Sequence, residues 1–276
     1  MIVTPALAAI IFVAGAVAGA LGALLGLGGG IFLVPLLNLG LGFPIGIAAA
    51  ISLATVIATS SAVTAGKAGQ HLMNFRLGMV LEVATAAGSV LGGITAQFVS
   101  QAVLQRLFAG VTAVVAIVTV ARSNRRNVIT DLLADPGLLG GRFFDHEHQR
   151  DIVYRIRNLP LALGASFVAG NVSSLLGIGG GVIKVPVLNA WCGMPLRAAA
   201  ATSAFMIGVT ATGGAIIYYG NGQLPPVAAA AAILGVQLGS HTGLRLSPKV
   251  HVRHLKLLLA AILGVVSTLM LVKGMR

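Results

Sequence analysis

The chain has few charged residues, and this shortage determines which solvent surrounds most of it. Asp, Glu, Lys and Arg make up only 9% of the 276 residues, whereas 57% are hydrophobic and the mean hydropathy is +0.97. Soluble globular domains carry roughly 25% charged residues. The composition therefore excludes an ordinary soluble domain and indicates a protein that lives in a lipid bilayer.

Cysteine, catalytic motifs and nucleic-acid-binding patterns are also missing. The single cysteine, Cys192, excludes an internal disulfide framework. The six His are isolated or lie in connectors, without a HisGluXaaXaaHis or GlyXaaSerXaaGly arrangement, which argues against an enzyme. The net charge of +12 sits mostly in a few loops and is not interleaved with aromatic residues, so nucleic acid is not expected as a partner. We expect no catalytic residue, no cofactor and no metal.

Long apolar runs are what the chain has instead. Most are close to the 20 residues that a membrane-spanning helix needs, and two are longer. The first run lacks the basic segment of a signal peptide, so we interpret it as structural. The sequence therefore predicts an all-α integral membrane protein, located in the cell inner (plasma) membrane, with runs at 5–38, 44–66, 77–99, 103–121, 159–190, 195–219, 224–244 and 255–272.

One segment occurs twice, 151 positions apart and without a gap. Residues 24–52 and 175–203 are identical at sixteen of 29 positions, beginning with LeuLeuGlyLeuGlyGlyGly and LeuLeuGlyIleGlyGlyGly. The register persists to the glycine pairs Gly88/Gly239 and Gly92/Gly243. A duplicated apolar segment interrupted by Gly and Pro is typical of secondary transporters built from two repeats.

The repeats predict the domain organisation. We expect a first transmembrane repeat at 1–121, a polar cytoplasmic linker at 122–158 and a second transmembrane repeat at 159–276. The linker contains seven Arg and five acidic residues, and AspProGly and GlyGly interrupt it. Two interpretations stay open for it: a solvated linker, or an interfacial helix built on its apolar residues Val128, Ile129, Leu132, Leu133, Phe143 and Phe144.

Each of the two long runs contains a GlyXaaGlyGlyGly cluster. Successive glycines destabilise a helix and allow a sharp turn. The eight or nine apolar residues that follow are too few to recross roughly 30 Å of hydrocarbon. We predict that each run is a broken, re-entrant element: a helix enters the membrane, turns at the glycines and returns as a half-helix. A kinked helix that crosses fully is the alternative.

The distribution of positive charge favours the re-entrant interpretation. With three true crossings per repeat, 14 of the 18 Lys and Arg share the linker side and three lie opposite, whereas eight simple crossings give 11 against six. The positive-inside rule then predicts a cytoplasmic linker and two periplasmic termini. An odd number of crossings makes the repeats inverted, which places a site at their interface near the midplane and suits alternating access.

The doubled glycine motif carries a resemblance to a known family. LeuLeuGlyIleGlyGlyGlyValIleLysValPro at 175–186, its counterpart at 24–35 and the AlaThrSer at 201–203 resemble the TauE/SafE family of sulfite and organosulfonate exporters. The resemblance covers essentially the whole chain. It implies export of sulfite or small organosulfonate anions across the inner membrane. Uptake of thiosulfate or another inorganic sulfur anion is the alternative.

The residues independently indicate an anion as the substrate. A half-helix that begins after three glycines presents free N–H groups and the positive end of its dipole, and glycines allow an oxyanion to approach closely. Close helix packing is the alternative role of such glycines. The candidate substrate-binding residues are the two clusters and nearby polar residues: Gly28, Gly29, Gly30, Gly179, Gly180, Gly181, Lys184, Ser52, Ser203, Asn171, Ser173 and Ser174.

Among these residues, Lys184 is a cation within an apolar run, where the first repeat has Leu33. It is expected either to neutralise the anion or to reach the cytoplasmic interface with its flexible side chain. Ser52 and Ser203 occupy equivalent positions. Asn171, Ser173 and Ser174 precede the second cluster and would donate hydrogen bonds either to sulfonate oxygens or to neighbouring helices.

Two further titratable residues are candidates for carrying a coupling proton. Glu82 is the only carboxylate in a spanning run, and His241 lies centrally in the seventh. Glu82 alternatively lies in the cytoplasmic headgroup zone, because it follows Arg76 by six residues. Pairs of glycines four residues apart favour internal packing over a dimer seam, and a homodimer stays open.

Overall fold

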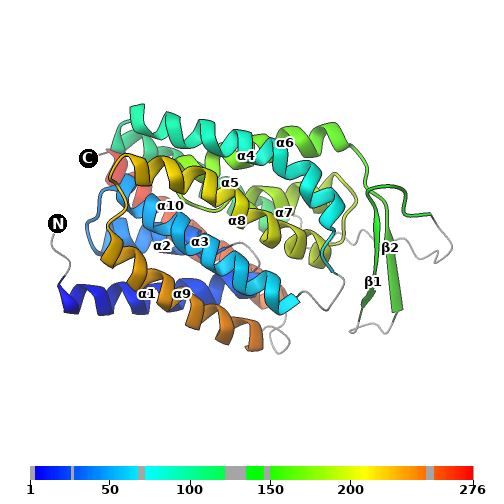
Figure 1. Cartoon of the computed structure of the whole chain (residues 1–276), viewed down its shortest axis with the longest axis horizontal. Helices are drawn as coiled ribbons and strands as arrows, with labels where there is room; N and C mark the ends of the chain where they lie inside the picture. Colours follow the sequence, from blue (N-terminus) through cyan, green and yellow to red (C-terminus); the bar gives the residue numbers. More distant parts are fainter. Residues whose placement is uncertain are drawn as a thin grey trace.

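The protein folds into a long bundle of helices with a small β-hairpin at one end (Figure 1). The structure, a computed structural model, describes residues 4–25, 28–67, 72–121, 135–145, 150–246 and 252–275. The elements in chain order are α1 (Pro5–Leu25), α2 (Gly30–Pro35), the π-helical η1 (Leu36–Gly40), α3 (Ile45–Lys67), α4 (Phe75–Phe98), α5 (Gln101–Ala121), β1 (Gly141–Asp145), β2 (Arg150–Tyr154), α6 (Leu159–Leu176), α7 (Gly181–Ala190), α8 (Leu196–Gly220), α9 (Pro226–Leu246) and α10 (Val252–Met275).

Seven helices in the described part of the chain are long and apolar enough to span a membrane: α1, α3, α4, α5, α6, α8 and α9. The apolar stretches Gly30–Gly40, Gly181–Ala190 and Ala261–Met275 are shorter. The prediction of an all-α, multi-pass membrane protein is confirmed. The helices begin within a few residues of the apolar runs because each run ends at a Pro, Gly or polar residue that interrupts the helical pattern.

Both long runs are broken at their glycines. The helix α1 is followed by α2 from Gly30, and α6 is followed by α7 from Gly181. In Figure 1, α1 and α3 begin at the same end of the bundle, whereas α6 and α8 begin at the other end. Each broken element therefore returns to the end from which it started, which is the course that the re-entrant interpretation requires. How the bundle sits in a bilayer remains a prediction.

Glycines allow the closest helix contacts, and these contacts follow the 151-residue register. A Cβ on Gly88 or Gly92 of α4 would collide with the backbone carbonyls of Phe167 and Asn171 in α6. Their counterparts in α9 meet α1 in the same way, Gly239 at the carbonyl of Ala16 and Gly243 at that of Ala20. These glycines are internal packing positions, and each half of the chain contributes one helix to each pair.

The described part of the linker contradicts its interpretation as an interfacial helix. Phe143 and Phe144 lie on β1, which pairs antiparallel with β2, and not on an interfacial helix. Side chains alternate along a strand, so Phe143 is buried and Phe144 is exposed. The hairpin is docked and not merely solvated, because Asn74 Nδ2 donates to the Leu139 carbonyl (2.8 Å) and to the Tyr154 hydroxyl (3.2 Å). Val128, Ile129, Leu132 and Leu133 lie outside the described residues.

Candidate functional site

The two glycine breaks meet at the centre of the bundle. Gly28 and Gly179 are 151 positions apart and both have positive φ, +75° and +82°. A Cβ on Gly28 would lie 3.5 Å from Val56 and 3.6 Å from Ile207, and a Cβ on Gly179 would lie 3.1 Å and 3.2 Å from the same two side chains. Val56 and Ile207 are themselves 151 positions apart. Both breaks therefore close around one apolar pair, Val56 from α3 and Ile207 from α8.

The first break is packed tightly against its surroundings. A Cβ on Gly29 would lie 2.9 Å from the Ala18 carbonyl, and one on Gly30 would lie 2.5 Å from the Gly177 carbonyl. Ser52 Oγ donates to that same Gly177 carbonyl at 2.6 Å. This hydrogen bond links α3 of the first half to the glycine break of the second half. The Ser52 hydroxyl therefore already has a hydrogen-bond partner within the protein.

The second break is flanked by two buried hydroxyls without a hydrogen-bond partner among the described residues. They belong to Ser173 at the end of α6 and Ser203 in α8, and both residues are 0% exposed. The Cβ position of Gly180 lies 3.5 Å from Ser173 Oγ, and that of Gly181 lies 3.1 Å from Ser203 Oγ. An unpartnered buried hydroxyl costs roughly 1–3 kcal/mol, so these two groups are suited to a ligand that enters the break.

The start of α7 offers fewer free backbone N–H donors than the glycine motif predicts. The N–H of Gly181 donates to the Gly179 carbonyl at 2.8 Å, and the N–H groups of Ile183 and Lys184 donate to the Gly180 carbonyl. The turn itself therefore satisfies these three groups. Side chains must therefore supply more of the hydrogen-bond donors of an anion site here than the backbone at the helix end.

The remaining polar candidates on α6 lie apart from the break. The hydroxyls of Ser174 and Ser89 are 2.6 Å apart, and Ser89 Oγ also donates to the Thr210 carbonyl. Asn171 is only partly buried and presents its backbone to Gly92 at the α4–α6 contact. These two candidates hold helices together, which is the alternative role that the sequence left open for them.

Lys184 and Glu82 form a buried cluster with Thr210. Lys184 is 1% exposed, and its Nζ lies 3.2 Å from Thr210 Oγ1 and 4.0 Å from Glu82 Oε2. Thr210 Oγ1 donates to Glu82 Oε1 at 2.8 Å, whereas Oε2 has no hydrogen-bond partner within the described structure. The ammonium is therefore enclosed by the protein and does not reach an interface, and Glu82 is also buried, at 8% exposed. The alternative in which Lys184 reaches the interface is therefore wrong, whereas the depth of Glu82 in the membrane stays a prediction.

The other coupling candidate lies elsewhere. His241 is exposed on α9, outside the cluster of Lys184, Glu82 and Thr210. In the 151-residue register Thr210 is the counterpart of Thr59, but its bridging position between Lys184 and Glu82 was not predicted. Its signal was its place on the same face of α8 as Ser203, seven residues and two turns away.

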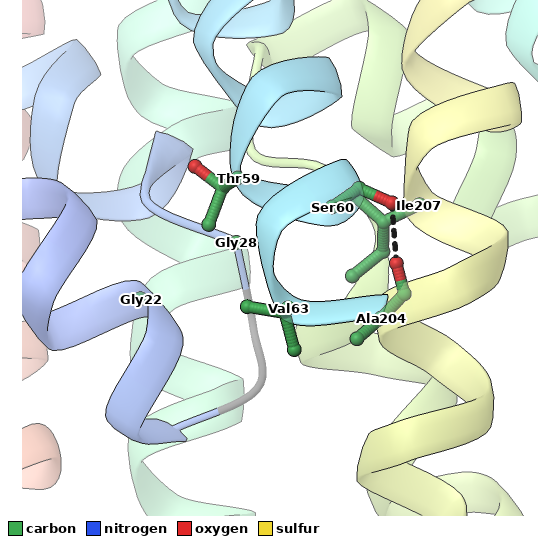
Figure 2. A pocket seen from close by; sticks show the side chains of 7 residues that line it. All are labelled: Gly22, Gly28, Thr59, Ser60, Val63, Ala204 and Ile207. Atoms are coloured by element: carbon green, nitrogen blue, oxygen red, sulfur yellow. Dashed lines mark hydrogen bonds between the residues drawn. The ribbon is translucent and has the colours of Figure 1, made fainter. Parts of the chain in front are cut away.

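A small pocket opens beside the first break, as Figure 2 shows. It encloses about 190 Å³ of empty space, including the part open to solvent. Two of its lining residues are joined by a hydrogen bond, which the Ser60 hydroxyl donates to the Ala204 carbonyl (Figure 2). It is lined by Gly22, Gly28, Thr59, Ser60, Val63, Ala204 and Ile207.

The fold is that of a multi-pass helical membrane protein, and a cluster of polar and charged groups lies buried inside its bundle. Comparison with known proteins gives the family: the profile "Sulfite exporter TauE/SafE" matches residues 11–270. The chain therefore belongs to the TauE/SafE sulfite exporter family, and it is a membrane transporter.

Two relatives match nearly their whole length. "Probable membrane transporter protein MJ0441" of Methanocaldococcus jannaschii is 26% identical over 277 residues, covering 95% of this chain and 94% of the relative. "Probable membrane transporter protein YunE" of Bacillus subtilis is 23% identical over 272 residues, covering 96% and 97%. No solved structure matches the chain significantly.

Proposed function

We propose that the protein exports sulfite or small organosulfonate anions across the inner membrane by alternating access. The family supports a sulfur-containing anion as the substrate. The anion would bind at the second glycine break, between Ser173 and Ser203 and one turn of α7 before Lys184. The observation that carries this assignment is the pair of buried, unpartnered hydroxyls beside Gly180 and Gly181.

Each group has a definite role in this proposal. The two serines would donate to sulfonate oxygens, and Lys184 would balance the charge. A charge-assisted hydrogen bond contributes about 1.5–3 kcal/mol, more than one between neutral groups. Ser52 would hold the turn in place through the Gly177 carbonyl, while Ser174 and Asn171 would maintain the helix packing around it.

Alternating access would use the duplication. We infer that the halves are inverted repeats, and the exchange of equivalent helices, α1 onto α9 and α6 onto α4, supports this inference. Val56 and Ile207 would then close the path between the two breaks. Movement of α3 relative to α8 would open either the Gly28 side or the Gly179 side to water.

Flux into proteoliposomes tests the proposal. We expect the purified protein to carry sulfite or methanesulfonate faster than protein-free liposomes, and a Ser173→Ala/Ser203→Ala double variant to bind about tenfold more weakly or worse. Thr64→Val is a matched control, because the Thr64 hydroxyl is also buried without a partner in the described structure but lies away from the second break. A carrier that moves only thiosulfate, and only inward, would favour the uptake alternative. Absence of flux for all three anions would contradict the proposal.

A further inference from the structure

The duplication relates two places in the bundle, and the buried pair of charges occurs at only one of them, with one charge from each half of the chain. Lys184 on α7 meets Glu82 on α4, and the positions equivalent to these two are Leu33 and Ile233. Both charges are therefore replaced by apolar residues at the mirrored place. Removing one charge would leave the other unpaired in a region of low dielectric, which costs several kcal/mol.

We propose that Glu82 occupies Lys184 when no anion is bound, and that anion binding transfers one proton from water to the Glu82 carboxylate. This inference rests on the proposed function above. The anion replaces the carboxylate as the partner of the ammonium, and the carboxylate becomes a neutral carboxylic acid. Binding of the anion and uptake of a proton are then two parts of one event.

Charge conservation inside the bundle supports this exchange. Without anion, the ammonium and the carboxylate sum to zero. With anion, the ammonium, the sulfonate and a neutral carboxyl also sum to zero, whereas an anion bound beside an ionised Glu82 would leave one uncompensated negative charge. Such a charge is expensive where Lys184 is 1% exposed and Glu82 8% exposed.

The geometry is already suited to the exchange. Glu82 is held by one hydrogen bond from Thr210, its Oε2 is free of hydrogen bonds within the described residues, and the ammonium lies 4.0 Å from Oε2. This ion pair is therefore not closed by a direct hydrogen bond. A protonated Glu82 keeps Oε1 as an acceptor for Thr210 and gains an O–H donor.

The titratable groups around Glu82 are few. Of the helices packed against α4, α6 carries none, and α8 carries Arg197 in its first turn and Tyr218 and Tyr219 in its last. On α4 itself, Arg76 lies in the first turn. Lys184 is thus the charged group that faces Glu82 within the bundle.

Coupling of anion binding to proton uptake affects the direction of transport. A singly charged anion that moves with one proton transfers no net charge, so the membrane potential does not act on the loaded carrier. The gradients of anion and proton alone then decide between export and uptake. Export occurs when the anion accumulates inside sufficiently to overcome the proton gradient.

Calorimetric titration of the purified protein with methanesulfonate tests the inference, because this anion keeps its single charge across the working pH range. We expect the affinity to fall as the pH rises, by up to about tenfold per pH unit, since the bound state holds one more proton. A weakly buffered solution with a pH indicator should show about one proton taken up per anion bound. The Asp151→Asn variant, which removes an exposed carboxylate on β2, is expected to behave as wild type.

The Glu82→Gln variant mimics the protonated carboxyl. We expect it to bind methanesulfonate with an affinity that does not change with pH and without proton uptake. A wild-type affinity independent of pH, or a Glu82→Gln variant that keeps the wild-type slope, would overturn the inference while leaving the binding site intact. If Glu82→Gln does not fold, the proton count of the wild type decides alone. No binding at any pH would contradict the proposed function, and this inference with it.

Discussion

At the residue scale, the ammonium of Lys184 is the group that sets the charge of the proposed site. It is buried and donates a hydrogen bond to Thr210 Oγ1, so its contribution to anion binding does not depend on lipid headgroups. We expect Lys184→Met, which keeps the length and removes the charge, to weaken anion binding about ten- to hundred-fold, corresponding to about 1.5–3 kcal/mol. Fluorescence titration with sulfite measures this directly.

Lys184→Arg serves as the companion variant. It retains the charge but replaces a compact ammonium with a wider planar guanidinium, so we expect intermediate affinity. Equal affinities of Lys184→Met and wild type would remove the lysine from the site. Both variants should be compared by thermal unfolding, because loss of the Glu82 partner also changes stability.

The sequence allowed most of these residues to be recognised but not their pairing. Lys184 and Glu82 each stood out because a charge in an apolar run is unusual, and each lacks a charged counterpart in the other half. That they meet, 102 positions apart and bridged by Thr210, depends on how α4 and α7 pack around α8. No periodicity within one helix encodes a contact of that kind.

At the scale of the elements, the turn between α6 and α7 is the feature most sensitive to substitution. Gly180 has φ +67°, and a Cβ there would lie 3.0 Å from the Ala169 carbonyl. We expect Gly180→Ala to destabilise the protein by about 1–2 kcal/mol, the usual cost of a left-handed non-glycine residue, and to reduce flux. Gly110→Ala in α5 is the control, since nothing lies within 4 Å of its Cβ position. Unchanged flux and melting temperature in Gly180→Ala would reduce this glycine to a spacer.

The helix pair α1 and α9 allows a second prediction. Gly239→Ala places a methyl group against the Ala16 carbonyl and must push the helices apart, which costs about 1–3 kcal/mol. We expect a lower melting temperature in detergent. Gly164→Ala in α6, where no atom lies within 4 Å, is expected to be neutral or stabilising. A Gly239→Ala variant as stable as wild type would contradict the close packing of these helices.

Elements with strong patterns were predictable, and the hairpin was not. The apolar runs and glycine clusters gave the helices and both breaks, because spanning length and helix-breaking residues are local properties. The strands β1 and β2 are five residues each and lie in a stretch rich in Arg, where charge suggested solvent. Their stability depends on burying Phe143, Ile152 and Tyr154 against the bundle, which only the tertiary structure reveals.

At the scale of the whole molecule, the start of α1 and the end of α10 lie at one end of the bundle, and the hairpin lies at the other (Figure 1). The charge distribution predicts that the hairpin end is cytoplasmic. We expect a cysteine at Leu138, which is 86% exposed, to resist a membrane-impermeant reagent in intact cells, and one at Met275, which is 67% exposed, to react. The native Cys192 is buried and is replaced by Ala in both variants. Labelling of both sites from outside would contradict the topology.

In the proposed mechanism, a sulfur-containing anion occupies the second glycine break and reaches it from both sides of the membrane. A Ser203→Cys variant without Cys192 tests it most directly, with Ser240→Cys in the α1–α9 contact as the control. The measurement is the rate of maleimide labelling of reconstituted protein, from either face, with and without methanesulfonate. We expect slow labelling of Ser203→Cys from both faces, decreased severalfold by the anion, and no effect of the anion on Ser240→Cys. Labelling of Ser203→Cys that is indifferent to the anion would contradict it.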